Sequence, residues 1–137
     1  MFQEDDPVRD QFNFSGDFRG AIVNINASLD RATQSVSQHQ DSLALDADRL
    51  RDLLLDLRTA LEASAPENAD DAEALAVSTT HLIEAAVADR PNRQLVKGAI
   101  QAVLTGGKSL IAASPKIATT VNQIIDTVQK LQELSDG

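Results

Sequence analysis

The residues of this chain that could bind a metal ion are two histidines and a set of carboxylates. His81 and Glu84 have the i, i+3 spacing found in the carboxylate-bridged metal sites of helical bundles. Such sites need a second pair of the same kind, and the sequence contains none. His39 lies in a polar stretch without a ligand pattern, and the acidic run from Glu67 to Glu73 lacks the glycine of a calcium loop. The pattern therefore predicts no metal site.

One tetrapeptide, Gly106-Gly107-Lys108-Ser109, resembles the end of a phosphate-binding loop. That loop needs another glycine five positions before Gly107, where this chain has Ala102, and it needs a preceding strand. The tetrapeptide instead interrupts a helical pattern, which predicts a kink. Because no nucleophile elbow and no identifiable carboxylate pair occur elsewhere, we expect a protein that is not an enzyme and binds no cofactor.

Length, charge and cysteine content limit the class of protein. The 137 residues fit one domain. The net charge of −9 argues against nucleic acid and against anionic lipid as partners. The absence of cysteine excludes disulfides and fits a reducing compartment. The N-terminus lacks the build of a signal peptide, and no run of about 18 apolar residues is present. We therefore expect a cytoplasmic protein.

The segment from residue 12 to residue 37 has the two-residue rhythm of a β-strand. Its apolar residues occupy even positions up to Ile22 and odd positions from Val23, so that both faces of a strand would need cover. We predict a polar tail over residues 1–11 and a β-like segment over residues 12–37. Residues 29–42 also fit a helix, because Leu29 and Val36 begin a heptad seam that continues to Leu61.

The remainder, residues 42–134, predicts a bundle of about four helices. The expected helices cover residues 42–64, 67–89, 93–113 and 115–134, and together with residues 12–37 they form a single domain. Asp41 or Ser42 would cap the first of them, and Ser114-Pro115 would begin the last. The last two helices form either a hairpin or one kinked rod. The residues predicted to face inward include Leu50, Leu53, Leu54, Leu57 and Leu61, then Leu75, Leu82 and Ile83, then Leu95, Val96, Ala99, Ile100, Val103 and Leu104, and finally Ile117, Val121, Ile124, Val128 and Leu131. The predicted fold class is thus mainly α, with an N-terminal β-like segment.

Several segments together carry a resemblance to a known kind of module. They are the string from Gly16 to Ile25 (GDFRGAIVNI), the acidic helix over residues 70–87, the break at residues 90–92 and the break at Ser114-Pro115. The chain from Phe14 onward resembles the helical accessory modules of multidomain bacterial signalling and conflict proteins. The resemblance implies an accessory role and no activity of its own.

A lone β-segment leaves backbone groups that can pair with another chain. Our first hypothesis is therefore a non-enzymatic module that binds itself, as a homo-oligomer, or another protein. The alternative is a membrane-active helical effector that uses residues 95–128, which are apolar but interrupted by lysines. Leakage of dye from liposomes would separate the two. The residues predicted to carry the protein contact are Phe12, Phe14, Phe18, Ile22, Val23 and Ile25.

Overall fold

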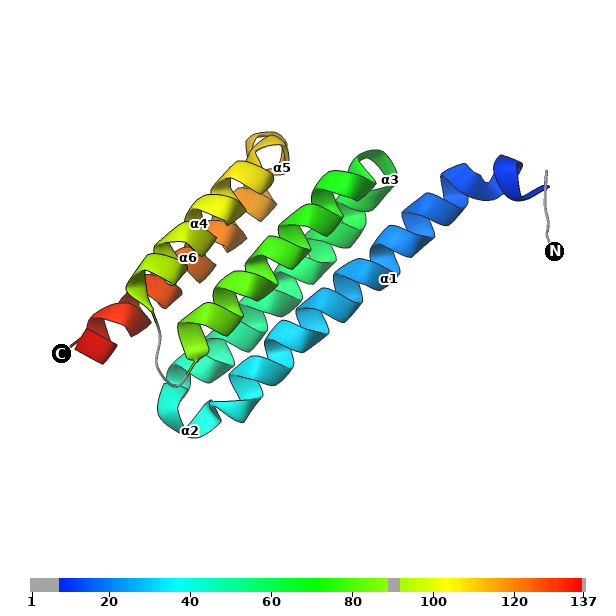
Figure 1. Ribbon diagram of the computed structural model, residues 1–137. Coiled ribbons are helices and arrows are strands. Elements are labelled where there is room, and N and C mark those ends of the chain that lie inside the picture. Colours follow the sequence, from blue (N-terminus) through cyan, green and yellow to red (C-terminus); the bar gives the residue numbers. More distant parts are fainter. Residues whose placement is uncertain (1–7, 89–91, 137) are drawn as a thin grey trace.

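The protein is a bundle of helices that lie side by side (Figure 1). The computed structural model describes the backbone of residues 8–88 and 92–136, and the side chains of residues 20–88 and 92–132. Within these ranges there is no strand, so the helical part of the prediction is confirmed and the β-like segment is not. The helices are α1 (Val8–Gln38), α2 (Gln40–Leu43), α3 (Leu45–Val87), α4 (Arg93–Gly106), α5 (Lys108–Ala113) and α6 (Pro115–Asp136).

The prediction of an extended segment over residues 12–37 is wrong, because these residues belong to α1. The change of parity near Ile22 reflects the helical period, in which core positions recur every three or four residues. The strand preference of Phe, Ile and Val depends on packing context, and here it yields to burial of one helix face against α3. Of the predicted tail, residues 8–11 are also helical, and residues 1–7 lie outside the described part. Among residues 20–38 of α1, the fully or nearly fully buried residues are Ala21, Ile25, Leu29, Ala32 and Val36.

Helix α3 folds back on itself as a hairpin. Its helical dihedral angles are interrupted at Asn68, which has φ −134° and ψ 48° and lies two residues after Pro66. The predicted end of a helix near Pro66 is therefore confirmed. In Figure 1 the two halves, residues 45–67 and 69–87, run in opposite directions beside α1. The turn at Asn68 lies at one end of the bundle, and the connection through α2 lies at the other end.

The connection into α3 contains a strained residue, Ala44. Its backbone has φ 53° and ψ −124°, a conformation that side chains other than glycine rarely adopt. The predicted cap by Asp41 or Ser42 is wrong, because α3 begins at Leu45 with no side-chain hydrogen bond at its cap, Ala44.

We expect Ala44→Gly to raise the free energy of unfolding by about 1 kcal/mol, since glycine removes the strain at this φ. Ala63→Gly is the matched control, because Ala63 is an exposed residue inside α3. There, glycine should lower the free energy of unfolding by about 1 kcal/mol. Urea titration followed by circular dichroism measures both changes, and equal destabilisation by the two variants would contradict the strained turn.

The C-terminal third forms a second hairpin, in which α4 and α6 run antiparallel (Figure 1). The predicted kink is confirmed at Gly107, which separates α4 from α5. Ser114 caps α6 as predicted, because its Oγ accepts a hydrogen bond of 3.3 Å from the backbone N–H of Ile117. The hairpin packs on α3 through the predicted row of α6, in which Ile117, Val121, Ile124, Val128 and Leu131 are all buried.

Candidate interaction surface

The six residues predicted to make a protein contact do not share one face of α1. Ile25 is fully buried in the core, Ile22 is partly buried against it, and Val23 is 64 % exposed. In a strand, Val23 and Ile25 would lie on the same face, but two residues along a helix turn the side chain by about 200°. The side chains of Phe12, Phe14 and Phe18 lie outside the described part, although their backbone belongs to α1.

The N-terminal part of α1 extends past the α3 turn (Figure 1). Asn24 Nδ2 donates a 2.9 Å hydrogen bond to Glu73 Oε1, five residues after Asn68. Arg31 contacts Glu84 further along, so α1 runs in the same direction as residues 69–87. The turn is therefore level with about residue 19 of α1. We call residues 8–19 the α1 extension; at 1.5 Å per residue it is roughly 18 Å long.

The core row of α1 continues into this extension. Phe18 precedes Ala21 by three positions, and Phe14 precedes Phe18 by four. The buried row from Ala21 to Val36 has the same spacings of three and four. Residues with this spacing share one side of a helix. Helix α1 therefore carries a core-type row over a greater length than α3 covers.

Polar contacts fix the position of α1 on the second half of α3. Glu84 accepts hydrogen bonds of 3.1 Å from Arg31 Nε and 2.9 Å from Arg31 Nη2, and this pairing raises the pKa of Arg31 above its usual value. Thr80 Oγ1 lies 2.8 Å from the backbone carbonyl of Ser28. These contacts set the direction in which the α1 extension projects.

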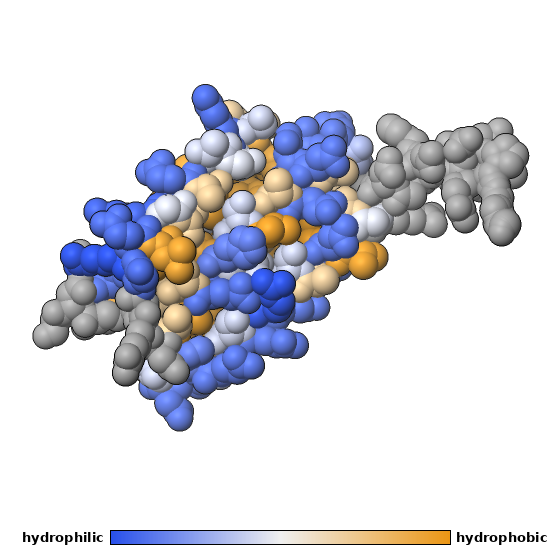
Figure 2. All heavy atoms as spheres, viewed as in Figure 1, coloured by the Kyte–Doolittle hydropathy of each residue, from blue (hydrophilic) through white to orange (hydrophobic). Residues whose placement is uncertain are grey.

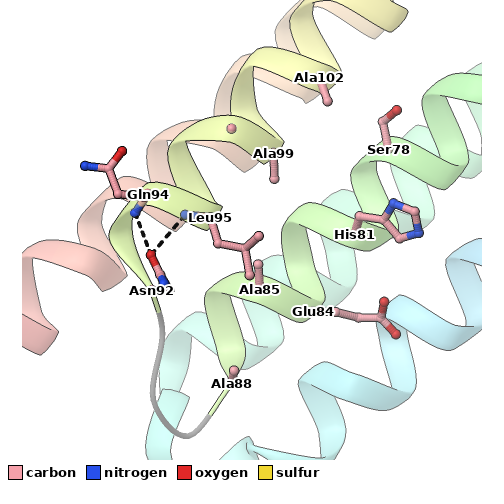
Figure 3. Close-up of a pocket in the computed structure, with 11 residues that line it drawn as sticks. Ser78, His81, Glu84, Ala85, Ala88, Asn92, Gln94, Leu95, Ala99 and Ala102 are labelled. Atoms are coloured by element: carbon pink, nitrogen blue, oxygen red, sulfur yellow. Dashed lines mark hydrogen bonds between the residues drawn. The ribbon is translucent and has the colours of Figure 1, made fainter.

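A groove of about 640 Å³ lies between the second half of α3 and α4. We call it the α3–α4 groove. In Figure 3, Leu95 and Ala99 of α4 point toward α3, and Glu84 points away from α4. Figure 2 shows apolar and small side chains on this face, with hydrophilic side chains around them. Its lining residues are Ser78, His81, Glu84, Ala85, Ala88, Asn92, Gln94, Leu95, Gly98, Ala99 and Ala102.

Two polar groups of the groove make structural contacts. Glu84 is paired with Arg31, and Asn92 Oδ1 accepts from the backbone N–H groups of Gln94 and Leu95 as the cap of α4. Across the described parts of the chain, no three His, Asp or Glu side chains are grouped so that they could hold a metal ion. The groove therefore presents an open, mainly apolar surface beside His81 and Ser78.

The sequence reasoning missed this groove because it placed Leu95 inside the bundle. Leu95 is 61 % exposed, and Leu104, also predicted to face inward, is 37 % exposed. In α4 only Val96 and Val103 are buried. The signal was present in the sequence, because apolar and small residues cover more than one face of residues 93–106, whereas one contact face needs only one stripe.

The glycine-rich tetrapeptide has a packing role. A Cβ at Gly107 would lie 2.7 Å from Leu75 Cδ1 and 3.0 Å from the carbonyl oxygen of Val103. Gly107 therefore lets the α4–α5 break approach α3 closely.

Comparison of the chain with protein-family models, with curated proteins and with solved structures found no match. No helix within residues 8–88 and 92–136 is long and apolar enough to cross a membrane.

Proposed function

We propose that this protein is a non-enzymatic interaction module that associates with itself through the α1 extension. The observation that carries the proposal is the core-type row of α1, which continues through Phe18 and Phe14 beyond the α3 turn. An amphipathic helix with an apolar row gains stability by laying that row on another surface. The contact is helical, and it replaces the strand pairing expected from the sequence.

The free energy gained by burying two phenylalanine side chains gives the order of magnitude of the free energy available for association. Each buries 150–250 Å² when covered, which at about 25 cal/mol per Å² gives roughly 10 kcal/mol for the pair. Association costs about 4–15 kcal/mol before any surplus appears. We therefore expect an oligomer that dissociates on dilution.

The resemblance to bacterial accessory modules supports a place for this module within a signalling or defence system. There it would bring copies of itself, and any component attached to them, together. This role needs no active site.

The test is the double variant Phe14→Asp/Phe18→Asp. We expect its mass by light scattering to fall to that of one chain, 14.7 kDa, because two charges would enter the contact. Its melting temperature should stay close to that of the unmodified protein, since the extension lies beyond the α3 turn. Val23→Asp is the control, because Val23 is exposed on the same helix outside the row, and it should keep the oligomer. An unchanged mass of the double variant would rule out the proposal.

A further inference from the structure

We infer that two copies of this chain can exchange helix α1, through straightening of the connection between α1 and α3. We call residues 39–44, which include α2, the hinge. The hinge lies at the end of the bundle opposite the turn at Asn68 (Figure 1). The partner is a second copy, whose α1 would cover the same face of α3 that α1 of the first copy covers in the closed protein. The inference is independent of the contact proposed for the α1 extension.

The hinge turns the chain without a residue that is suited to a turn. Residues 21–65 contain neither glycine nor proline, the residues that most often end helices and make turns. Ala44 instead takes φ 53° and ψ −124°, a conformation that glycine adopts readily and alanine does not. Strain in a short hinge favours exchange of an element between copies, because opening the hinge relieves the strain.

The apolar row of the two helices passes through the hinge without a change of phase. From Leu29 to Leu61 the row positions alternate spacings of four and three, which is the heptad pattern of helices that pack side by side. The buried apolar members of the row are Leu29, Val36, Leu43, Ala47, Leu50, Leu54, Leu57 and Leu61. A straight helix through the hinge would therefore present all of them on one side, and a second helix would be needed to cover them.

Two contacts between α1 and the first half of α3 are placed symmetrically about Ala44. Arg51 Nη1 donates a hydrogen bond of 3.2 Å to Ser37 Oγ, and these residues lie one heptad on either side of Ala44. Arg58 Nη1 donates a hydrogen bond of 3.3 Å to Asp30 Oδ1, and these residues lie two heptads on either side. If two straightened chains lie antiparallel with a two-fold axis at Ala44, the same pairs form between the copies without a change of register.

Exchange keeps the contacts of the closed protein and changes only the hinge. The Arg31–Glu84 ion pair and the hydrogen bond from Asn24 to Glu73, which join α1 to the second half of α3, would also form between copies. Each copy donates one α1 and receives one, so the assembly closes at two chains. Because α1 has to leave the core first, exchange is slow in the folded protein and takes place when chains refold together at high concentration.

The test refolds the Phe14→Asp/Phe18→Asp variant, so that its outcome does not depend on the phenylalanines of the α1 extension. After refolding from urea at high protein concentration, we expect light scattering to show a dimer that does not form on refolding at low concentration. Adding Ala44→Gly should weaken this dimer by at least about tenfold, because glycine relieves the strain of the closed hinge and destabilises the straight helix. Ala63→Gly is the control, because Ala63 is an exposed residue of α3 outside the hinge, and it should leave the dimer fraction unchanged.

A second variant acts in the opposite direction. Deletion of residues 39–45 removes the hinge and one whole heptad, so that the row keeps its phase and only the straight helix remains. This variant should be a dimer at every concentration at which it is folded.

Cross-linking identifies the exchange itself, since the unmodified chain has no cysteine. With Asp30→Cys/Arg58→Cys added, a short bismaleimide should join two chains in the dimer fraction and should link one chain to itself in the monomer fraction, as resolved by denaturing electrophoresis. Four results would each overturn the exchange: no dimer on refolding, dimers with cross-links only within single chains, a dimer fraction that Ala44→Gly leaves unchanged, or a folded monomer of the hinge deletion. None of these results bears on the contact of the α1 extension, which the mass of the phenylalanine variant tests before refolding.

Discussion

Ile25→Asp should lower the free energy of unfolding by at least about 4 kcal/mol, because it buries a charge that has no partner. Ile25 has no exposed surface and belongs to the core cluster between α1 and α3. The loss comes from two sources, the missing side-chain contacts and the desolvation of the carboxylate. Total stabilities of domains are about 5–15 kcal/mol, so the variant should unfold at low urea or at room temperature.

Val23→Asp is the matched comparison, two residues away on the same helix. Val23 is 64 % exposed, so its replacement should change the free energy of unfolding by no more than about 0.5 kcal/mol. Urea titration followed by circular dichroism gives both values. Equal losses for the two variants would indicate that positions 23 and 25 share one face, as in a strand, and would contradict a helical α1.

Leu75→Ala and Gly107→Ala should each destabilise the protein, but they should compensate one another in the double variant. Leu75 is fully buried, and its removal should cost about 2–5 kcal/mol through the cavity that remains. Gly107→Ala should cost about 1–3 kcal/mol, because the new methyl group would overlap Leu75 Cδ1. In the Leu75→Ala background the methyl group occupies vacated space, so its cost should fall to the smaller part that comes from the carbonyl oxygen of Val103.

Gly106→Ala is the control for this cycle, since a Cβ there meets only Ser78 Oγ at an ordinary 3.6 Å. Alanine at this helical position should be neutral or stabilising by up to about 1 kcal/mol. Thermal or urea unfolding of the four proteins of the cycle measures the coupling. Strictly additive losses would show that Gly107 and Leu75 do not meet, and would contradict the packing of the α4–α5 break on α3.

The sequence predicted most of the bundle where apolar rows are long and continuous. The leucines of residues 50–61 and the row from Ile117 to Leu131 are buried as expected, because their spacing fits only a helix. The breaks at Pro66 and Gly107 were predictable from the backbone limits of those residues. The capped start at Ser114 followed from its hydroxyl.

The N-terminal segment could not be assigned correctly from its own residues. Over residues 12–25 the apolar positions fit period two almost as well as period 3.6, and Phe, Ile and Val favour strands locally. What decides the outcome is a tertiary contact with α3, including the hydrogen bond from Asn24 to Glu73, which lies 49 residues further along the chain. A contact between residues so far apart in the sequence cannot be predicted from the spacing of apolar residues within one segment.

Of the two candidate surfaces, the sequence indicated one and did not predict the other. The phenylalanines were singled out from the sequence as part of a strand. Phe14 and Phe18 instead have the helical spacing of the buried row that contains Ala21 and Ile25. The groove was not predicted, since Leu95 was assigned to the core from its apolar character alone. Whether an apolar residue of α4 meets the core or solvent depends on how closely α4 approaches α3, and the small residues at positions 98, 99 and 102 leave that face open.

The mass of the unmodified protein in solution, measured by light scattering over a range of concentrations, tests self-association most directly. Self-association predicts a multiple of the mass of one 14.7 kDa chain at high concentration, with a decrease toward 14.7 kDa on dilution. A mass of 14.7 kDa at every concentration would contradict it, because the core-type row of the α1 extension would then need no second copy to cover it.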